Sequence, residues 1–241
     1  MDLKQRYGMV FWRHAEKKET DFNEVAERVY KVLNVFVNNF PAKYRPNYLT
    51  VNKKSETKLY EWNFENFCKD LKINVNHTKG RVFKELGYSL SFFSSLNNFE
   101  SFSYRIHVGA TDVNFTNAIV INLSMDFDYF DKKVASKLEQ IFYQCVKEFD
   151  AYYACMSNSQ IPLRKGCYTS LDDVPNDVHW LNYWSDEILK KIDIKKLKKL
   201  EKKYKEFSFN NGFIKLQDIA LNAENPKDLQ YKEQIEQELG I

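Results

Sequence analysis

Cysteine, glycine and proline are all scarce in this chain, and their scarcity excludes several classes of protein. The 241 residues include 4 cysteines, 7 glycines and 5 prolines. The cysteines are Cys68, Cys145, Cys155 and Cys167. They form no CxxC pair, so the pattern indicates neither a zinc site nor a redox dithiol, and we expect reduced core thiols. No Pro/Gly/Ser-rich linker or low-complexity tract divides the chain, and its length predicts one domain, residues 1–241.

Long hydrophobic runs and a strong charge of one sign are also missing. No segment approaches the roughly 20 consecutive apolar residues that a membrane helix needs. The first residues, MDLKQRYGMVFW, contain no apolar core followed by a small-residue cleavage site. We therefore expect a soluble, cytoplasmic protein without a membrane partner. The net charge is +3, from 36 basic and 33 acidic residues, which is too balanced to indicate a nucleic-acid partner by itself.

Sequence motifs of catalysis and metal binding are absent as well. The chain has no HExxH, EF-hand, GxSxG, Walker or GxGxxG motif. Its four histidines, at positions 14, 77, 107 and 179, are far apart in sequence. Cys155 and His107 could act as nucleophile and base only if the fold brought them together. Cys155 lies in an apolar segment, where burial raises the pKa of a thiol and makes it inert. We expect no enzymatic activity, cofactor or metal.

Hydrophobic periodicity predicts an α+β fold, with a largely antiparallel sheet and amphipathic helices packed on it. Apolar runs and alternation predict strands over residues 7–14, 86–93, 103–111, 117–124, 151–157 and 178–184. Helical spacing predicts helices over residues 21–40, 64–71, 131–149, 190–207 and 226–239, with a further helix starting near Ser185. The first strand is apolar at consecutive positions, which is typical of a strand covered on both faces.

Residues at the ends of these segments support the predicted boundaries. Asp21, Asp131 and Asn225 stand where N-caps are expected, and Gly240 stands where a C-terminal helix stop is expected. Asn211-Gly212 is the dipeptide favoured in two-residue hairpins, and it lies between apolar residues.

The segment DVHWLNYWSD, residues 177–186, has two competing interpretations. A strand with Val178, Trp180 and Trp184 on one face could form a stacking platform for a base or a sugar. Two such rings exposed side by side would leave an apolar patch that soluble monomers usually avoid. Covered by a helix, the same rings become core, and the structural interpretation is favoured.

The segment MDFDYFD, residues 125–131, collects carboxylates between a strand and a helix. They could hold a divalent cation, face a basic partner, or only cap the helix and solvate a loop, which is the simplest interpretation. The segment lacks the glycine and distal glutamate of a calcium loop. If it has a function, we expect a protein partner to bind Asp126, Asp128, Tyr129 and Asp131, with Tyr129 as an aromatic anchor.

The lysine-rich segment 190–205 also has two interpretations. Its lysines could contact phosphates, which would make the chain a nucleic-acid-binding accessory protein. Acidic residues such as Glu201 and Asp193 dilute the charge, and no aromatic side chain is interleaved on the polar side for base stacking. A solvated helical face is favoured, and nucleic acid remains the alternative partner.

The C-terminal third resembles a known family. HWLNYWSDEIL, FNNGFIKLQD and NPKDLQYKEQIEQELG, in this order, resemble the C-terminal pattern of the immunity protein 52 family of bacterial polymorphic toxin systems. The N-terminal segments FWRH, ELGYSLSFF and NAIVINLS are compatible with that family. The matching positions are aromatic and glycine residues of the scaffold, so no functional residue carries over. The resemblance implies an immunity protein that binds a cognate secreted toxin, nucleases being among the toxins of such systems, and inhibits it stoichiometrically.

Overall fold

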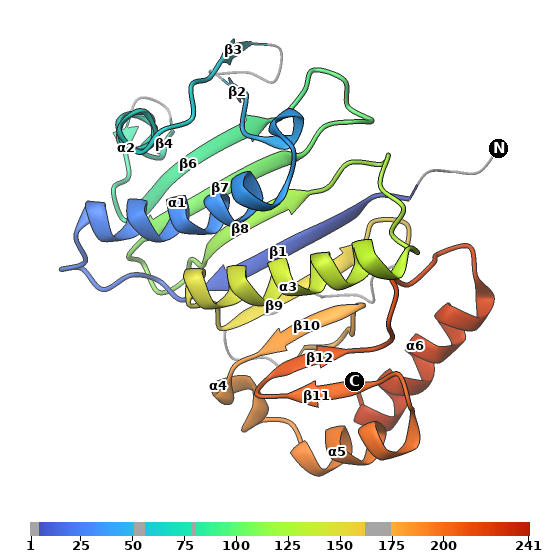
Figure 1. Ribbon diagram of the computed structural model, residues 1–241. Helices are drawn as coiled ribbons and strands as arrows, with labels where there is room; N and C mark the ends of the chain where they lie inside the picture. Colours follow the sequence, from blue (N-terminus) through green and yellow to red (C-terminus); the bar gives the residue numbers. More distant parts are fainter. Residues whose placement is uncertain (1–4, 51–55, 79–80, 162–174) are drawn as a thin grey trace.

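The structure is a computed structural model that describes residues 5–50, 56–78, 81–161 and 175–241. Ten antiparallel strands form one sheet in the order β11-β12-β10-β9-β1-β8-β7-β6-β2-β3, and β4 pairs with β5 separately (Figure 1). The strands are β1 Tyr7–Arg13, β2 Tyr48–Thr50, β3 Thr57–Leu59, β4 His77–Thr78, β5 Arg81–Val82, β6 Leu86–Phe93, β7 Ser103–Ala110, β8 Asn117–Asn122, β9 Tyr153–Asn158, β10 Leu181–Trp184, β11 Ser208–Asn210 and β12 Phe213–Lys215. The helices are α1 Phe22–Asn39, α2 Phe64–Ile73, α3 Lys132–Phe149, α4 Asp186–Leu189, α5 Ile194–Lys203 and α6 Pro226–Leu239, with a 3-10 turn at Ala42–Tyr44. The predicted α+β class is confirmed.

Strand β1 lies at the centre of the sheet because it is apolar on both faces. It pairs with β8 on one side and β9 on the other. Tyr7, Met9 and Phe11 are buried on one face, and the ring of Phe11 lies 5.7 Å from that of Phe142 on α3. Val10 is buried on the opposite face. The prediction of a strand covered on both sides is confirmed.

Helices α1 and α3 pack against each other and lie across one face of the sheet (Figure 1). The predicted N-caps are present: the Asp21 side chain accepts a hydrogen bond from Asn23 N, and that of Asp131 accepts from Lys133 N and Val134 N. Within the described residues, no helix has both the length and the apolar character needed to cross a bilayer.

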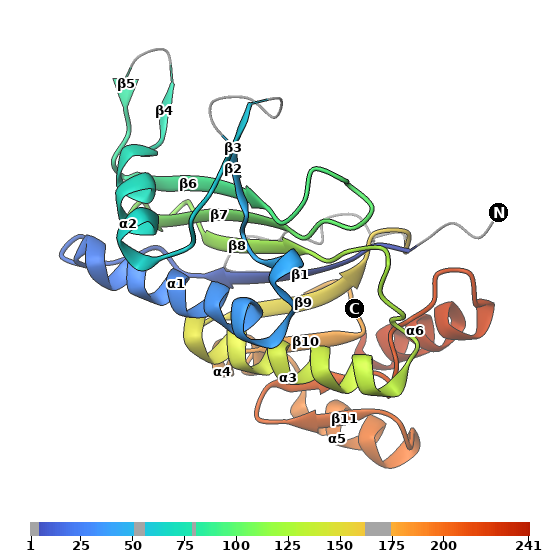
Figure 2. The same ribbon diagram turned by 45° about the horizontal axis from the view of Figure 1, so that its top comes forward.

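The opposite face of β6, β7 and β8 is largely polar, with Phe93 and Val120 among its polar side chains. The three strands form an antiparallel meander, and Figure 2 shows them side by side. Ser91, Arg105 and Val120 are cross-strand neighbours, as are Phe93, Ser103 and Asn122. Tyr104, Ile106 and Ile121, which have the other parity, are buried beneath the helices. The alternation thus directs one set of side chains into the core and leaves a polar set on the other face.

The segment containing the two tryptophans belongs to the core. Trp180 and Trp184 are 1% and 0% exposed, and the Trp180 Nε1 donates to the carbonyl of Gln217 at 2.9 Å. The strand was predicted from residue 178, but β10 begins only at Leu181. The reason is the Asn182 side chain, which accepts from His179 N at 2.9 Å and donates to His179 O at 2.8 Å, and so holds the preceding residues in a turn.

The lysine-rich helix is shorter than predicted. Asp193 caps its start by accepting from Lys195 N, and α5 therefore begins at Ile194. Its apolar stripe is buried at Leu197 and Leu200. One of its lysines contacts the last helix: Lys196 Nζ donates to the carbonyl of Leu239 on α6 at 2.8 Å.

A buried charge cluster joins α6 to the segment before β10. Lys232 Nζ donates to carboxylate oxygens of Asp177 and Glu236, and all three side chains are buried. Burial and the hydrogen bond to Asp177 raise the pKa of Glu236. Burial alone would raise the pKa of Asp177, but hydrogen bonds from Glu236 and Lys232 and the nearby positive charge lower it. The lysine thus lies between the two buried carboxyl groups and donates to both.

The Asn211-Gly212 hairpin forms as predicted, between β11 and β12. Both residues have positive φ, 47° and 84°, as a two-residue type I′ turn requires. A Cβ on Gly212 would collide with the carbonyl oxygen of Trp184.

Gly212→Ala is expected to lower the free energy of unfolding by about 1–3 kcal/mol, because the new methyl group meets backbone and the left-handed conformation disfavours alanine. Chemical denaturation measures the change. Asn211→Gly is the matched control and should change stability by less than about 1 kcal/mol, since glycine accepts the same φ. Equal losses in the two variants would contradict this explanation.

Candidate functional site

The fold separates the one cysteine–histidine pair considered as nucleophile and base. Cys155 lies on β9 and His107 on β7, and β1 and β8 lie between them. At about 4.8 Å per strand, the backbones are roughly 14 Å apart. His107 instead shares a hydrogen bond with Ser89 Oγ at 2.9 Å, and burial lowers its pKa.

The cysteines that the structure describes do not gather into a metal site. Cys145 and Cys155 are buried and Cys68 is half-buried; Cys167 lies outside the described residues. Burial raises the pKa of Cys145 well above its usual value. No group of three or more His, Cys, Asp or Glu side chains in the described ranges could hold a metal ion.

The segment 125–131 uses most of its predicted site residues for internal contacts. Tyr129 was expected as an exposed aromatic anchor, but it is only 3% exposed: its ring packs 4.2 Å from that of Tyr7, and its hydroxyl donates to the carbonyl of Ser124. That part of the prediction is wrong, because burying a large ring beside the central strand stabilises the fold more than leaving it exposed to water. Asp131 caps α3, and Asp128 accepts from Phe130 N at 3.0 Å.

Asp126 connects this segment to the rest of the fold. Its carboxylate accepts from the hydroxyl of Tyr44 at 3.0 Å and from Ser124 Oγ. Burial alone would raise the pKa of Asp126, but hydrogen bonds from Ser124, Tyr44 and Lys43 lower it. Whether the segment also binds a partner stays a prediction.

The loop 94–101 lies against this segment and exposes two large apolar side chains of its own. The carbonyl of Phe99 accepts from Met125 N at 2.9 Å and from Ser124 Oγ at 3.0 Å. These bonds fix the loop, yet the side chains of Phe99 and Leu96 are 61% and 65% exposed.

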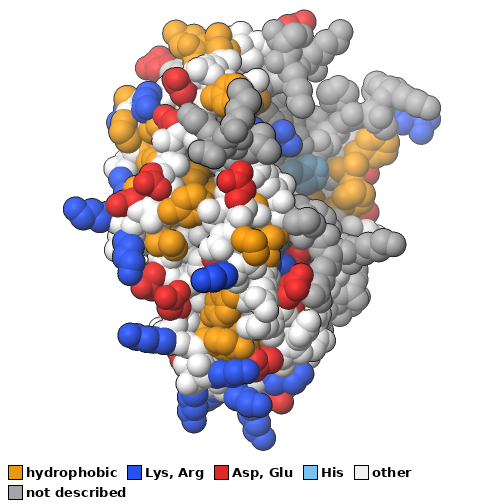
Figure 3. All heavy atoms as spheres, turned by 90° about the vertical axis from the view of Figure 1, so that its right-hand side faces the viewer, with side chains coloured by type: hydrophobic (Ala, Val, Ile, Leu, Met, Phe, Trp, Pro, Cys, Tyr) orange, Lys and Arg blue, Asp and Glu red, His pale blue; other side chains and the backbone are white. Residues whose placement is uncertain are grey.

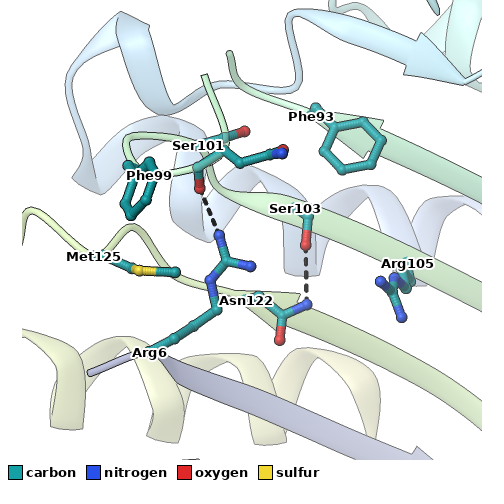
Figure 4. Close-up of a pocket in the computed structure, with 9 residues that line it drawn as sticks. Arg6, Phe93, Phe99, Ser101, Ser103, Arg105, Asn122 and Met125 are labelled. Carbon is teal, nitrogen blue, oxygen red and sulfur yellow. Dashed lines mark hydrogen bonds between the residues drawn. The ribbon is translucent and has the colours of Figure 1, made fainter. Parts of the chain in front are cut away.

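A cavity of about 400 Å³ opens beside Phe99, on the polar face of the sheet (Figure 4). We call it the arginine pocket. The described residues that line it are Arg6, Phe93, Asn98, Phe99, Ser101, Ser103, Arg105, Asn122 and Met125. Two of these residues are cationic and none is acidic.

Strand register positions the polar floor of the pocket. Asn122 Nδ2 donates to Ser103 Oγ at 2.9 Å, between the neighbouring strands β8 and β7. Gly8 on β1 leaves room for the Asn122 side chain, because a Cβ there would lie 3.0 Å from Asn122 Oδ1. Figure 4 shows Arg6 and Arg105 on either side of this Ser103–Asn122 pair.

The two arginines differ in how they are held. Arg6 precedes β1, and its Nη2 donates to the carbonyl of Asn98 at 2.5 Å. Its Nε is shielded from solvent and has no hydrogen-bond partner in the part of the chain that the structure describes. Arg105 is exposed and makes no hydrogen bond or ion pair with any described residue. Sequence reasoning missed both, although Arg105 occupies a polar position of an alternating strand.

Carboxylates gather elsewhere, in a groove of about 570 Å³ near the other end of β1. It is lined by residues that include Asp150, Asp186, Glu187, Tyr152 and Tyr183. The surface that Figure 3 shows, by contrast, mixes exposed apolar side chains with charges of both signs. A second local concentration of acidic groups therefore exists, away from the 125–131 segment.

No protein-family model matches the chain, and no curated protein matches it either. Among solved structures, the chain is similar to the Pseudomonas aeruginosa T6SS protein PA0821. The two share 9% sequence identity with a TM-score of 0.56, and the match covers 98% of this chain and 76% of that one. At this identity the likeness shows a related fold.

Proposed function

We propose that the chain is an immunity protein, which binds a cognate bacterial toxin in the cytoplasm and neutralises it at a one-to-one ratio. On this proposal the chain acts by binding alone, without a catalytic step. The resemblance to the immunity protein 52 family suggests the class, and the likeness in fold to a T6SS protein supports a role connected with secretion or toxin systems.

The observation that carries the proposal is the surface beside the arginine pocket. Phe99 and Leu96 are exposed on a loop whose backbone is fixed by hydrogen bonds, and Arg6 and Arg105 line the same cavity as Phe99. Aromatic and arginine side chains dominate the binding energy of protein interfaces, and a rigid loop loses little entropy on binding.

Co-expression tests the proposal. The toxin encoded beside the gene for this chain, produced in a sensitive host, should stop growth, and the chain should restore it. Growth that stays arrested while the chain is soluble and abundant would refute the proposal. Tight binding to DNA or RNA that falls steeply with salt would favour the alternative, a nucleic-acid-binding protein that uses α5.

The segment 125–131 can be tested in the same assay with Asp126→Lys/Asp128→Lys. We expect weaker protection, because the Ser124 hydroxyl lies within hydrogen-bond distance of both the Asp126 carboxylate and the Phe99 carbonyl, so loss of the carboxylate changes how the hydroxyl is held beside Phe99. Thermal unfolding must first show that the variant folds. Asp128→Lys alone is the control for surface charge, since Asp128 is exposed and bonds only within its own turn. Full protection by the folded double variant would remove this segment from the interface.

A further inference from the structure

We propose that the arginine pocket is an acceptor site for a carboxylate on an acidic segment of the partner protein. The inference rests on the proposed function and adds which side of the contact is charged positively: this chain supplies the cations and the partner supplies the carboxylate. It reverses the charge pattern expected from the sequence, in which acidic residues at 125–131 would meet a basic partner.

The first observation behind the inference is that the described lining of the pocket is positively charged. Two guanidinium groups border one cavity, and no described lining residue is acidic. Arginine usually pairs with carboxylates, because its planar fork can donate two parallel hydrogen bonds to one. Arg105 has no such partner in the described ranges, so its donors are available to a ligand.

The second observation is that the pocket contains hydrogen-bond donors for an oxyanion. Arg6 is held in place through Asn98, which leaves other donors of its guanidinium for a ligand. Ser103 Oγ accepts from Asn122 and still carries its own hydrogen. The cavity thus offers a bound oxyanion the donors of a fixed cation, of a cation without a described partner and of a hydroxyl group.

The walls of the pocket favour a carboxylate on a protein over a phosphate. Phe93, Phe99 and Met125 border the cavity, and apolar borders that exclude water strengthen a charged contact at an interface. Phosphate sites commonly use backbone N–H groups at the start of a helix. The described lining residues of this pocket instead lie on strands and loops.

Nuclear magnetic resonance with a tetraglutamate peptide tests the inference without the toxin. At low salt, the peptide should cause saturable shifts in the Nε–H signals of Arg6 and Arg105 and in the side-chain amide of Asn122. Arg105→Gln should abolish the shifts of the Arg6 and Asn122 signals. Arg81→Gln, which changes an exposed arginine on β5, should leave them intact. Because Arg105 is exposed and unpaired within the described residues, Arg105→Gln should change stability by less than about 0.5 kcal/mol.

Three results would overturn the inference: no shifts at millimolar peptide, unchanged shifts in Arg105→Gln, or equal shifts with inorganic phosphate or a tetralysine peptide.

The growth assay separates failure of this inference from failure of the proposed function. If wild-type protein and Arg105→Glu protect equally well, the pocket lies outside the interface while the immunity role stands. If the pocket is correct, Arg105→Glu should bind the toxin at least about tenfold more weakly, and Asp186→Lys/Glu187→Lys, in the groove near the other end of β1, should bind normally.

Discussion

Trp180→Ala is expected to lower the free energy of unfolding by about 3–5 kcal/mol, the range for removing a large buried aromatic side chain. The ring is almost fully buried, and its Nε1 donates to the carbonyl of Gln217. The variant therefore leaves both a cavity and a buried acceptor that loses its partner. Urea denaturation monitored by circular dichroism measures the loss.

Trp180→Phe is the control for this variant. It keeps an aromatic ring but removes the donor to Gln217, so the loss should be smaller than in Trp180→Ala. An unchanged denaturation midpoint in Trp180→Ala would show that the ring does not contribute to the core, and would reopen its interpretation as a ligand platform.

Lys232→Met is expected to cost about 3–5 kcal/mol, because it leaves Asp177 and Glu236 buried without their cation. In this variant the two carboxyl groups are expected to have folded-state pKa values above their unfolded values. Groups of this kind favour the folded state at low pH, and the advantage is lost as the pH rises through the folded pKa. The deficit relative to wild type should thus be larger at about pH 7 than at about pH 5.

Lys227→Met is the matched control on the same helix. Lys227 is exposed, so its replacement should change stability by less than about 0.5 kcal/mol at either pH. A deficit of Lys232→Met that does not depend on pH would mean that lost packing, and not the unpaired carboxyl groups, causes the destabilisation.

The sequence predicts the parts of this fold that depend on local patterns. Helices α1 and α3 each have an apolar stripe and an aspartate cap, and β1 has a continuous apolar run, so these elements appear close to their predicted places. Strands β2 and β3 have only three residues each at the edge of the sheet, too few for a period to be visible. The start of β10 depends on side-chain hydrogen bonds of Asn182, which no periodicity reveals.

The arginine pocket could not be predicted for a different reason. Arg6, Phe99 and Arg105 come from separate segments, and only the strand order β1-β8-β7 brings them to one cavity. The error at Tyr129 is of the same kind. An aromatic residue between carboxylates is typical of an exposed loop, but its contact with Tyr7 depends on the tertiary fold.

Titration of purified toxin with purified chain tests the immunity role most directly. Toxin activity should fall in proportion to added chain and reach its minimum at one equivalent, and the mixture should elute as a one-to-one complex in size-exclusion chromatography with light scattering. Full toxin activity in the presence of excess folded chain, with the two proteins eluting separately, would contradict the account.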